Sequence, residues 1–354
     1  MKNMRVCILF GGPSREHEIS MQSGMNVARS ALAAGNVVWP VIWTRAGAWK
    51  FPDDLVMDPV RLELLLGELP DLLPRSPAEL LARCAGLGIE CVFPVLHGPW
   101  GEDGRIQGFW QVAGVPVVGQ EVLGAAISMD KLVTKALLVA AGLPTARFVE
   151  LRDPDPATAA DTAGRELGYP LVLKAPSEGS SFGIAMIRNE GEFLRSYPAI
   201  HAMEKRVLAE AYFPGKELTC GVLRQEDGSL RALLPTEIVP RVSTYFDFEA
   251  KYRPDGSDEI TPARITPSQT EKIQHLAKLA HDALRLGQLS RIDFILQEPD
   301  DWVILEANAM PGFTARSLYP QAAEAAGLSV ASLVDHLLKT AIPGLVRPDP
   351  GCTR

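Results

Sequence analysis

The chain has 354 residues, a length that predicts two or three domains with room for hydrophobic cores. Its composition, 47% hydrophobic and 22% charged, is that of a globular protein, and a formal net charge of −8 leaves no basic stripe for nucleic acid. Apolar runs are too short for a membrane span or a signal peptide, so no membrane partner is expected. Five cysteines, an odd number without metal-type spacing, predict reduced thiols and a cytoplasmic protein.

The N-terminal part of the chain is predicted to be an α/β unit. An apolar strand over Arg5–Phe10 runs into a glycine loop, and a helix is expected over Glu18–Ala34. A second strand, Glu90–Pro94, leads into a glycine-rich polar loop and a helix over Ile106–Ala113. Because α/β folds bind ligands in loops at the carboxyl ends of strands, these two loops predict one face of a doubly wound domain over about residues 1–120.

Three ionisable residues, Glu16, His17 and Glu18, crowd the first of these loops. A helix-capping role for one of them is the default interpretation, and a contact with a ligand is the alternative. The neighbouring glycines are explained by turn geometry alone. The residue pattern therefore leaves both interpretations of this loop open.

A phosphate site is predicted further along the chain. A helix is expected to begin at Asp130, with Lys131 and Lys135 one turn apart, and the strand Pro170–Lys174 runs into a serine- and glycine-rich loop. Backbone N–H groups and hydroxyls of such a loop can wrap phosphate oxygens while the ammonium of Lys174 supplies charge. The lysine precedes the glycines, so this is not the GxxxxGK[ST] phosphate loop. A flexible hairpin loop beside a lysine that reaches out to solvent is the alternative.

Two weaker signals follow. The strand Arg206–Ala211 turns at residues 212–217, where Phe213 is flanked by the acids Glu210 and Glu217, a set that could contact an adenine and a ribose. The aromatic-rich stretch 244–252 is typical of either a poorly ordered loop or a lid. Its aromatic residues favour a lid that excludes water.

The segment from Arg291 to Ser317 carries the strongest polar pattern. It predicts two strands, Arg291–Gln297 and Trp302–Ala307, joined by a polar turn. Side chains alternate between the faces of a strand, so Arg291 and Asp293 share one face, and Glu306 and Asn308 share one face of the partner strand. If the hairpin is in register, the carboxylate and amide oxygens of these residues converge as ligands that suit Mg²⁺. A solvated hairpin edge, whose acids pair with Arg291, is the alternative.

Sequence blocks along nearly the whole chain, from Arg5 to about Leu337, resemble the motifs of the D-alanine–D-alanine ligase family in the same order. The blocks are FGGPSREHEIS, PVLHGPWGEDGRIQG, ISMDKLVTK, KAPSEGSSFG, FEAKY, RIDF and LEANAMPGFTARSLYP. The resemblance implies the α/β ATP-grasp fold with three domains and the nucleotide between the last two. The expected domains are residues 1–120, 121–210 and 211–345, with a lid over 240–260 and a tail over 346–354.

The resemblance also implies roles for particular residues. Those matching contacts to ATP are Lys131, Lys174, Ser181, Glu210, Ala211, Phe213, Glu217 and Lys251. Those matching the ligands of two magnesium ions, for which Mn²⁺ is an acceptable substitute, are Asp293, Glu306 and Asn308. Those matching catalytic positions are Glu16, Ser180, Tyr252, Arg291 and Gly312, and those matching the walls of the substrate site are His97, Ser317 and Leu318.

The implied reaction is an ATP-dependent ligation. ATP would phosphorylate the carboxylate of a first D-alanine, and the amine of a second would attack the acyl phosphate to give D-alanyl-D-alanine for peptidoglycan synthesis and cell-wall biogenesis. Expected partners are D-alanine and ATP, and a homodimer, since members of the family are commonly dimers. A ligase joining another amino acid pair, or a carboxylate kinase, is the alternative.

The chain departs from the family pattern mainly near the substrates. Ala175 separates Lys174 from a proline, and Phe246 and Phe248 stand where tyrosines are common. The segment Glu306–Pro311, with Met310, replaces a commoner Asn-Thr-x-Pro, and Arg316 stands at a position that in the family lies close to the second substrate. The nucleotide and metal positions are spared. The chemistry is therefore better determined by the sequence than the acceptor is.

Overall fold

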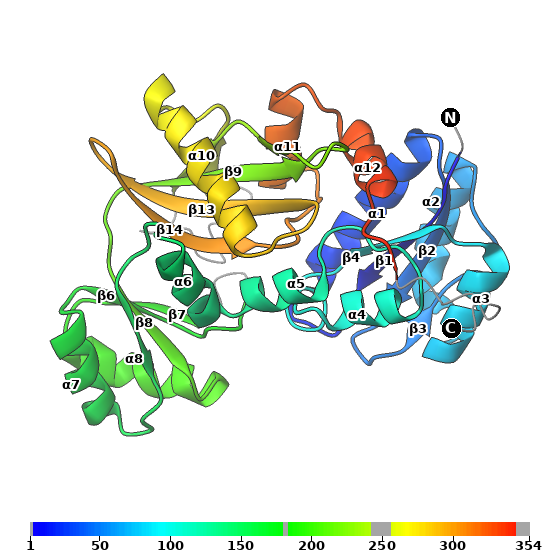
Figure 1. The fold of residues 1–354 in the computed structure, drawn as a ribbon. Coiled ribbons are helices and arrows are strands. Elements are labelled where there is room, and N and C mark those ends of the chain that lie inside the picture. The colour runs from blue at the N-terminus through cyan, green and yellow to red at the C-terminus, as the bar shows by residue number, and fades with distance from the viewer. Residues whose placement is uncertain (1–2, 180–182, 242–255, 345–354) are drawn as a thin grey trace, which may run out of the picture.

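The computed structural model describes residues 3–179, 183–241 and 256–344, which fold around three β-sheets (Figure 1). The N-terminal part contains β1 (Arg5–Gly11), α1 (His17–Ala33), β2 (Val37–Trp43), β3 (Trp49–Lys50), α2 (Pro59–Glu68), η1 (Leu69–Asp71), α3 (Pro77–Leu87), β4 (Cys91–Val95) and α4 (Arg105–Val112). The middle part contains α5 (Val122–Met129), α6 (Lys131–Ala140), β5 (Phe148–Leu151), α7 (Pro156–Glu166), β6 (Leu171–Lys174), β7 (Ile184–Ile187), α8 (Glu190–Met203) and β8 (Val207–Ala211). The last part contains β9 (Lys216–Arg224), β10 (Leu230–Ala232), β11 (Thr236–Pro240), β12 (Ser257–Ile260), α10 (Pro267–Ala283), β13 (Leu289–Gln297), β14 (Asp301–Asn308), α11 (Leu318–Ala325) and α12 (Val330–Lys339).

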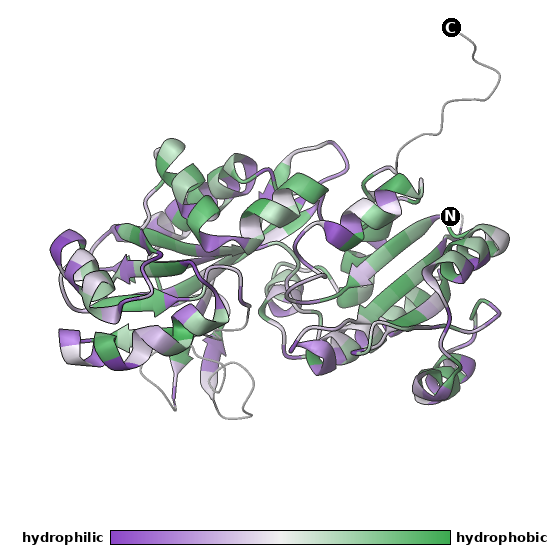
Figure 2. Ribbon diagram, turned by 90° about the horizontal axis from the view of Figure 1, so that it is seen from below, coloured by the Kyte–Doolittle hydropathy of each residue, from purple (hydrophilic) through white to green (hydrophobic). Residues whose placement is uncertain are grey.

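The first sheet has the order β3-β2-β1-β4, with β1 parallel to β2 and to β4. Its strands are hydrophobic along their length, whereas hydrophilic residues line the outer faces of the surrounding helices (Figure 2). Helix α1 packs directly on β1 at Gly24, where a Cβ would lie 2.3 Å from the Cβ of Phe10. This close approach fixes the loop between β1 and α1, and with it Glu16, at the carboxyl edge of the sheet.

The other two sheets are antiparallel. One has the order β12-β11-β9-β13-β14, with β10 beside β9, and α10 packs on it; the other has the order β5-β8-β6-β7, and α8 packs on it. Figure 1 shows the second of these below the first, joined through α5 and α6 to the N-terminal part. The nucleotide is expected between these two sheets.

The β13–β14 hairpin has the predicted register. Arg291 lies opposite Asn308, and Asp293 lies opposite Glu306. Directly after this pair the ladder shifts, because Phe294 pairs with Ile304 and leaves Leu305 as an extra residue. Such a bulge re-aims side chains, and here it lets Leu305 and Glu306 line the same cavity.

The C-terminal helix α12 returns to the first sheet and packs against α1 (Figure 1). Its buried residues Leu333, Val334, Leu337 and Leu338 belong to the same apolar core as Val6 and Ile8 of β1. The last part of the chain is thereby anchored to the first. Within the described residues, no helix is long and apolar enough to cross a membrane. The described cysteines, Cys7, Cys84, Cys91 and Cys220, are buried free thiols.

The predicted strands and helices agree with the structure to within a few residues at their ends. Helix α5 was not predicted. It ends where Asp130 adopts an extended conformation and caps α6 through the N–H groups of Leu132 and Val133, so two short helices follow each other. The proposed domain boundaries after 120, 210 and 345 stay predictions. Most of the predicted lid and all of the predicted tail lie outside the described residues.

Candidate active site

The predicted metal ligands lie together on the β13–β14 hairpin. Oδ1 of Asp293 accepts a hydrogen bond from Nε of Arg291, and Oδ2 accepts one from a terminal nitrogen of the same guanidinium, both at 2.8 Å. Asp293 also accepts from Nδ2 of Asn308 at 2.9 Å and from Oγ1 of Thr219 at 2.7 Å. Oε2 of Glu306 lies 3.5 Å from Nζ of Lys131.

These contacts bear on both interpretations of the hairpin. Asp293 does pair with Arg291, as the solvated-edge alternative expected, but Asp293 is only 6% exposed and is therefore part of a buried polar cluster. The described residues hold no group of three His, Cys, Asp or Glu side chains arranged for a metal. The predicted set, however, has two carboxylates and one amide, which are hard oxygen donors of the kind that Mg²⁺ takes. These residues fit the ion, and their role as ligands stays a prediction.

A cavity of about 120 Å³ between the two antiparallel sheets collects Lys174, Glu210, Ala211, Phe213 and Glu217 of the residues predicted for nucleotide binding, while Lys131 lines a smaller cavity beside Glu306. Its polar lining includes Lys174, Glu210, Glu217, Asp293 and Glu306, and its apolar lining includes Val172, Ile184, Met186, Ala211, Phe213, Ile295 and Leu305. Residues that are far apart in the sequence, on β6, β8, β9, β13 and β14, thus form one pocket. It has apolar walls for a flat base and a charged end for phosphates.

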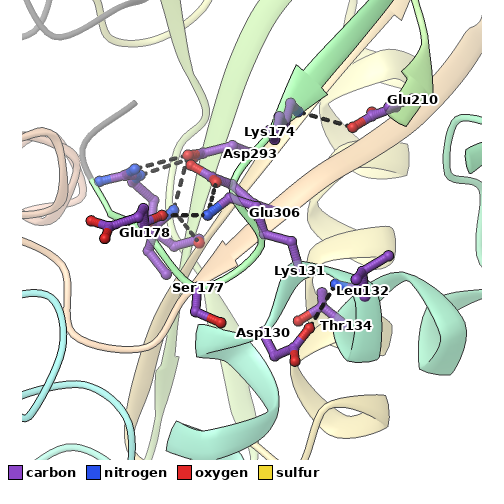
Figure 3. A network of polar contacts seen from close by, with 12 residues as sticks. Asp130, Lys131, Leu132, Thr134, Lys174, Ser177, Glu178, Glu210, Asp293 and Glu306 are labelled. Atoms are coloured by element: carbon purple, nitrogen blue, oxygen red, sulfur yellow. Dashed lines mark hydrogen bonds and ion pairs between the residues drawn. The ribbon is translucent and has the colours of Figure 1, made fainter. Parts of the chain in front are cut away.

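Figure 3 shows how Lys174, Glu210 and Glu306 of this pocket and the nearby Lys131 lie. Lys174 pairs with Glu210, with Nζ 2.9 Å from Oε2, while Lys131 reaches toward Glu306 from the first turn of α6. Nζ of Lys131 also donates to the carbonyl of Glu178 at 2.8 Å. Lys131 therefore links the predicted phosphate loop to the hairpin.

A second lysine on α6, Lys135, is fully buried, although no functional role was predicted for it. Its Nζ lies 3.1 Å from Oε1 of Glu210 and donates to Oγ1 of Thr145 at 2.7 Å. One carboxylate thus receives two lysines. The apolar residues Leu132 and Leu138 lie three positions on either side of Lys135 and could have indicated its buried position on the helix.

The pKa shifts in this cluster follow from burial and mutual attraction. Burial lowers the pKa of Lys135, despite the opposing effect of Glu210. Burial also acts to lower the pKa of Lys174, but Glu210 and Glu306 outweigh it and leave that pKa raised. Burial acts to raise the pKa of Glu210, but Lys135 and Lys174 outweigh it and leave that pKa below its usual value. Glu210 is therefore a charged carboxylate in the wall of the pocket.

A larger cavity, of about 490 Å³, lies further along the same face of the hairpin. It is lined by the predicted residues Glu16, His97, Arg291, Asn308, Gly312, Ser317 and Leu318, and also by Glu102, Glu259 and Arg316. Arg291 and Asn308 border this cavity while Asp293 and Glu306, their neighbours on the same strands, border the nucleotide pocket. Because alternate residues of a strand share one face, the two cavities are neighbours along the same face of the hairpin.

Glu16 does not act as a helix cap. It occupies the N-cap position of α1, but its side chain makes no capping hydrogen bond, so the capping interpretation is wrong for this residue. Oε2 of Glu16 lies against two glycines, because a Cβ at Gly98 or Gly179 would come within 2.7 Å or 2.6 Å of it. The glycine loops leave room for this carboxylate at the wall of the cavity.

His97, which is buried, and Glu102, which is partly buried, lie around Glu16. Nε2 of His97 lies 3.3 Å from Oγ of Ser23, and burial lowers the pKa of His97, partly offset by Glu16. Glu102 accepts from the N–H of Gly98 at 2.6 Å, and burial together with the charge of Glu16 raises its pKa to about 8. Glu102 was not predicted as a site residue, although it belongs to the glycine-rich loop that pointed to this edge of the sheet.

Ser317 and Gly312 are also neighbours. Oγ of Ser317 accepts from the N–H of Thr314 at 2.9 Å, and a Cβ on Gly312 would lie 2.8 Å from this oxygen. Leu318 is the first residue of α11 and borders the same cavity. The predicted residues Ser180, Ser181, Lys251 and Tyr252 lie outside the described residues, as do Phe246 and Phe248.

Comparisons with known proteins give a consistent result. Residues 5–120 match the family model described as D-ala D-ala ligase N-terminus, and residues 137–339 match the model described as D-ala D-ala ligase C-terminus. The chain is 38% identical to a D-alanine–D-alanine ligase of Streptomyces coelicolor, with 96% of this chain and 93% of that protein covered. It is 36% identical to one of Mycobacterium tuberculosis, with 96% of each chain covered.

Solved structures agree with these sequence comparisons. The VanG D-Ala:D-Ser ligase from Enterococcus faecalis has a TM-score of 0.82 and 29% identity, with 96% of this chain and 99% of that chain covered. The D-alanine–D-alanine ligase from Coxiella burnetii has a TM-score of 0.77 and 28% identity, with 96% and 94% covered. The predicted ATP-grasp fold is confirmed, and the chain belongs to the D-alanine–D-alanine ligase family.

Proposed function

We propose that this protein is an ATP-dependent ligase that joins two D-alanine molecules into D-alanyl-D-alanine. The observation that carries the proposal is the shared hairpin: along one of its faces, Asp293 and Glu306 border the nucleotide pocket, and Arg291 and Asn308 border the larger cavity. A phosphoryl group held beside Asp293 and Glu306 is then next to a carboxylate held beside Arg291 and Asn308. This arrangement suits direct transfer from ATP to a substrate carboxylate.

The first step is phosphorylation of the donor. An oxygen of the first D-alanine carboxylate attacks the γ-phosphorus of ATP, and ADP leaves, so that an acyl phosphate forms. Lys131 and Lys174 offset the repulsion between the two anions, and Asp293, Glu306 and Asn308 would hold the metal. Magnesium bound there would supply charge that neutralises the phosphate oxygens. Glu16 receives the ammonium of the donor, which keeps its carboxylate directed at the hairpin.

The second step is formation of the amide. The amine of the second D-alanine, once it has lost its proton, attacks the acyl carbon, and the carbonyl electrons move onto oxygen. The guanidinium of Arg291 and the N–H of Gly312 stabilise this oxyanion. Collapse of the intermediate expels phosphate, which retains one oxygen of the donor carboxylate. Ser317 and Leu318 border the region that would hold the carboxylate of the acceptor.

A ligase with a different acceptor is the second candidate, and the polar wall of the larger cavity favours it. Arg316 and Glu259 both border the cavity next to Ser317. The amide of Gln321 donates to Glu259 at 2.9 Å and to the carbonyl of Arg316 at 2.8 Å, which ties this wall together. The similar VanG structure is that of a D-Ala:D-Ser ligase. D-Serine, whose side chain adds a hydroxyl, is therefore the competing acceptor to test.

The test is an acceptor competition. The purified protein is incubated with ATP, Mg²⁺ and equimolar D-alanine and D-serine, and products are identified by mass. The proposal expects ATP-dependent D-alanyl-D-alanine as the main product, and it is wrong if D-alanyl-D-serine predominates or if ADP forms without any dipeptide. Omission of the metal, or its replacement by Mn²⁺, tests the proposed ion. A homodimer, a cytoplasmic location and a role in peptidoglycan synthesis rest on the family and belong to the same proposal.

A further inference from the structure

The segment Ala309–Phe313, here called the oxyanion loop, joins the end of β14 to the residues before α11 and carries Gly312. It lies outside the regular helices and strands, so backbone bonds within a sheet or helix do not fix its course. Its peptide groups are held instead by side chains from the first 120 residues. These side chains form three consecutive anchors along the loop.

The first anchor is Gln120, which is fully buried. Its Nε2 donates to the carbonyl of Ala309 and to the carbonyl of Leu289, both at 2.6 Å, and its Oε1 accepts from the N–H of Gly287 at 2.6 Å. Both N–H donors and the carbonyl oxygen of this buried amide are directed at the roots of β13 and β14. The side chain ties the start of the loop to the strand that carries Arg291.

The second anchor lies at Met310. The backbone of Met310 raises the pKa of His97 and lowers the pKa of Glu102, in each case against the effect of burial. His97, Glu102 and Met310 also line one cavity. A loop of the first sheet therefore lies against the peptide of Met310, two residues before Gly312.

The third anchor follows Gly312 directly. The N–H of Phe313 donates to Oγ of Ser23 at 3.2 Å, and its carbonyl accepts from Nδ2 of Asn26 at 2.7 Å. Both partners are on α1. The ring of Phe313 is fully buried and meets Phe93 of β4 edge to face, with ring centroids 5.4 Å apart. The peptide next to the proposed oxyanion donor is therefore locked onto the first sheet.

We propose that Gln120 and Asn26 are positioning residues for catalysis, which set the direction of the Gly312 N–H through the oxyanion loop. The inference rests on the proposed function and extends it, because it makes the geometry of the oxyanion site depend on the N-terminal part of the chain. A donor that stabilises charge only in the transition state affects kcat rather than substrate binding. Loss of either anchor should therefore lower kcat, while the KM for ATP, set in a different pocket, stays constant.

The chain offers a matched control in Gln288. It is 2% exposed, and its side chain also makes three hydrogen bonds. Its Nε2 donates to the carbonyl of Leu337 and to Oγ1 of Thr340, and its Oε1 accepts from the N–H of Gly119. These bonds reach α12 and the segment before Gln120, and not the oxyanion loop. Gln288→Met and Gln120→Met remove equal numbers of buried hydrogen bonds, so they should lower the thermal midpoint similarly.

The experiment compares the full-length wild type with Gln120→Met, Asn26→Leu and Gln288→Met. Dipeptide formation is measured against D-alanine and ATP concentrations, and thermal unfolding is followed on the same samples. We expect kcat to fall roughly ten- to a hundred-fold in Gln120→Met and Asn26→Leu, with the KM for ATP within about twofold of wild type. Gln288→Met should keep its kcat within about twofold.

Each outcome has a distinct meaning. If Gln120→Met does not fold, Asn26→Leu, whose bond is only partly buried, decides the question alone. The positioning role is overturned if the wild type is active and Asn26→Leu has the same kcat. It is also overturned if Gln288→Met lowers kcat as much as the anchor variants do. A folded wild type that makes no dipeptide refutes the proposed function, and the inference falls with it.

Discussion

Replacement of Lys135 by methionine tests the electrostatics of the nucleotide pocket. Lys135 and Lys174 each lie about 3 Å from an oxygen of Glu210, at 3.1 Å and 2.9 Å, and all three side chains are largely or wholly buried. Glu210 therefore competes with the phosphates of ATP for the ammonium group of Lys174. Repulsion from Lys135 weakens the pairing of Lys174 with Glu210, so Lys135→Met should leave Lys174 more tightly paired and less available to ATP.

The size of the effect follows from the geometry. Two ammonium groups that contact opposite oxygens of one carboxylate are at most ~8 Å apart, where like charges repel by about 2 kcal/mol at an effective dielectric constant of about 20. Loss of this repulsion corresponds to roughly thirty-fold weaker ATP binding. Glu210 keeps Lys174 as its partner, so the loss of folding free energy should stay below the ~3 kcal/mol typical of a buried pair that is broken outright.

The assay is the KM for ATP in dipeptide synthesis together with direct ATP binding by calorimetry. Thr145→Val is the control, because it removes the hydrogen bond from Lys135 to Thr145 and keeps both charges. We expect the KM for ATP to rise roughly thirty-fold in Lys135→Met and less than about threefold in Thr145→Val, with the KM for D-alanine unchanged in both. A folded Lys135→Met protein that binds ATP as tightly as the wild type would refute this reasoning.

Three further substitutions have defined outcomes. Glu306→Gln should lower kcat on the order of a thousand-fold without changing the melting curve, because a predicted ligand of both magnesium ions is lost. Near-normal turnover in this variant would refute the metal assignment. Glu16→Gln should raise the KM for the first D-alanine roughly ten-fold and leave that for ATP unchanged, and a shift in melting temperature alone would contradict its ammonium role. The third substitution is Glu102→Gln. Burial and Glu16 raise the pKa of Glu102 to about 8 in the folded protein, against an ordinary 4.5. Between these pH values the folded state keeps a proton on Glu102 that the unfolded state has lost, so the stability of the wild type falls as the pH rises. The difference in thermal midpoint between Glu102→Gln and wild type should grow more positive from pH 5 to pH 9, and a constant difference would show that Glu102 does not titrate in this range.

The sequence predicted the parts of the site whose signal is local. Arg291, Asp293, Glu306 and Asn308 stood out because alternation along a strand determines which side chains share a face, and the short polar turn determines the register. The observed pairing of Arg291 with Asn308 confirms that reasoning. The bulge after Asp293 could not be predicted, because the pattern of Leu305 and its neighbours is equally compatible with a regular ladder.

Residues whose meaning depends on distant partners were not predicted. Lys135 looks like an ordinary helix lysine until the fold brings Glu210, on β8, to 3.1 Å from it. Gln120 carries no motif, and its partner Ala309 is 189 residues away along the chain. Glu102 was visible as part of a loop, but its raised pKa depends on burial and on Glu16. These properties arise only when the three sheets come together.

The central claim is that this protein phosphorylates a carboxylate and then replaces the phosphate with an amine. The most direct test supplies D-alanine with ¹⁸O in both carboxylate oxygens, together with ATP and Mg²⁺, and measures the mass of the released phosphate. The account predicts one ¹⁸O in each phosphate released with a molecule of dipeptide, since the donor oxygen that attacks phosphorus leaves with it. Unlabelled phosphate accompanying dipeptide would contradict the account.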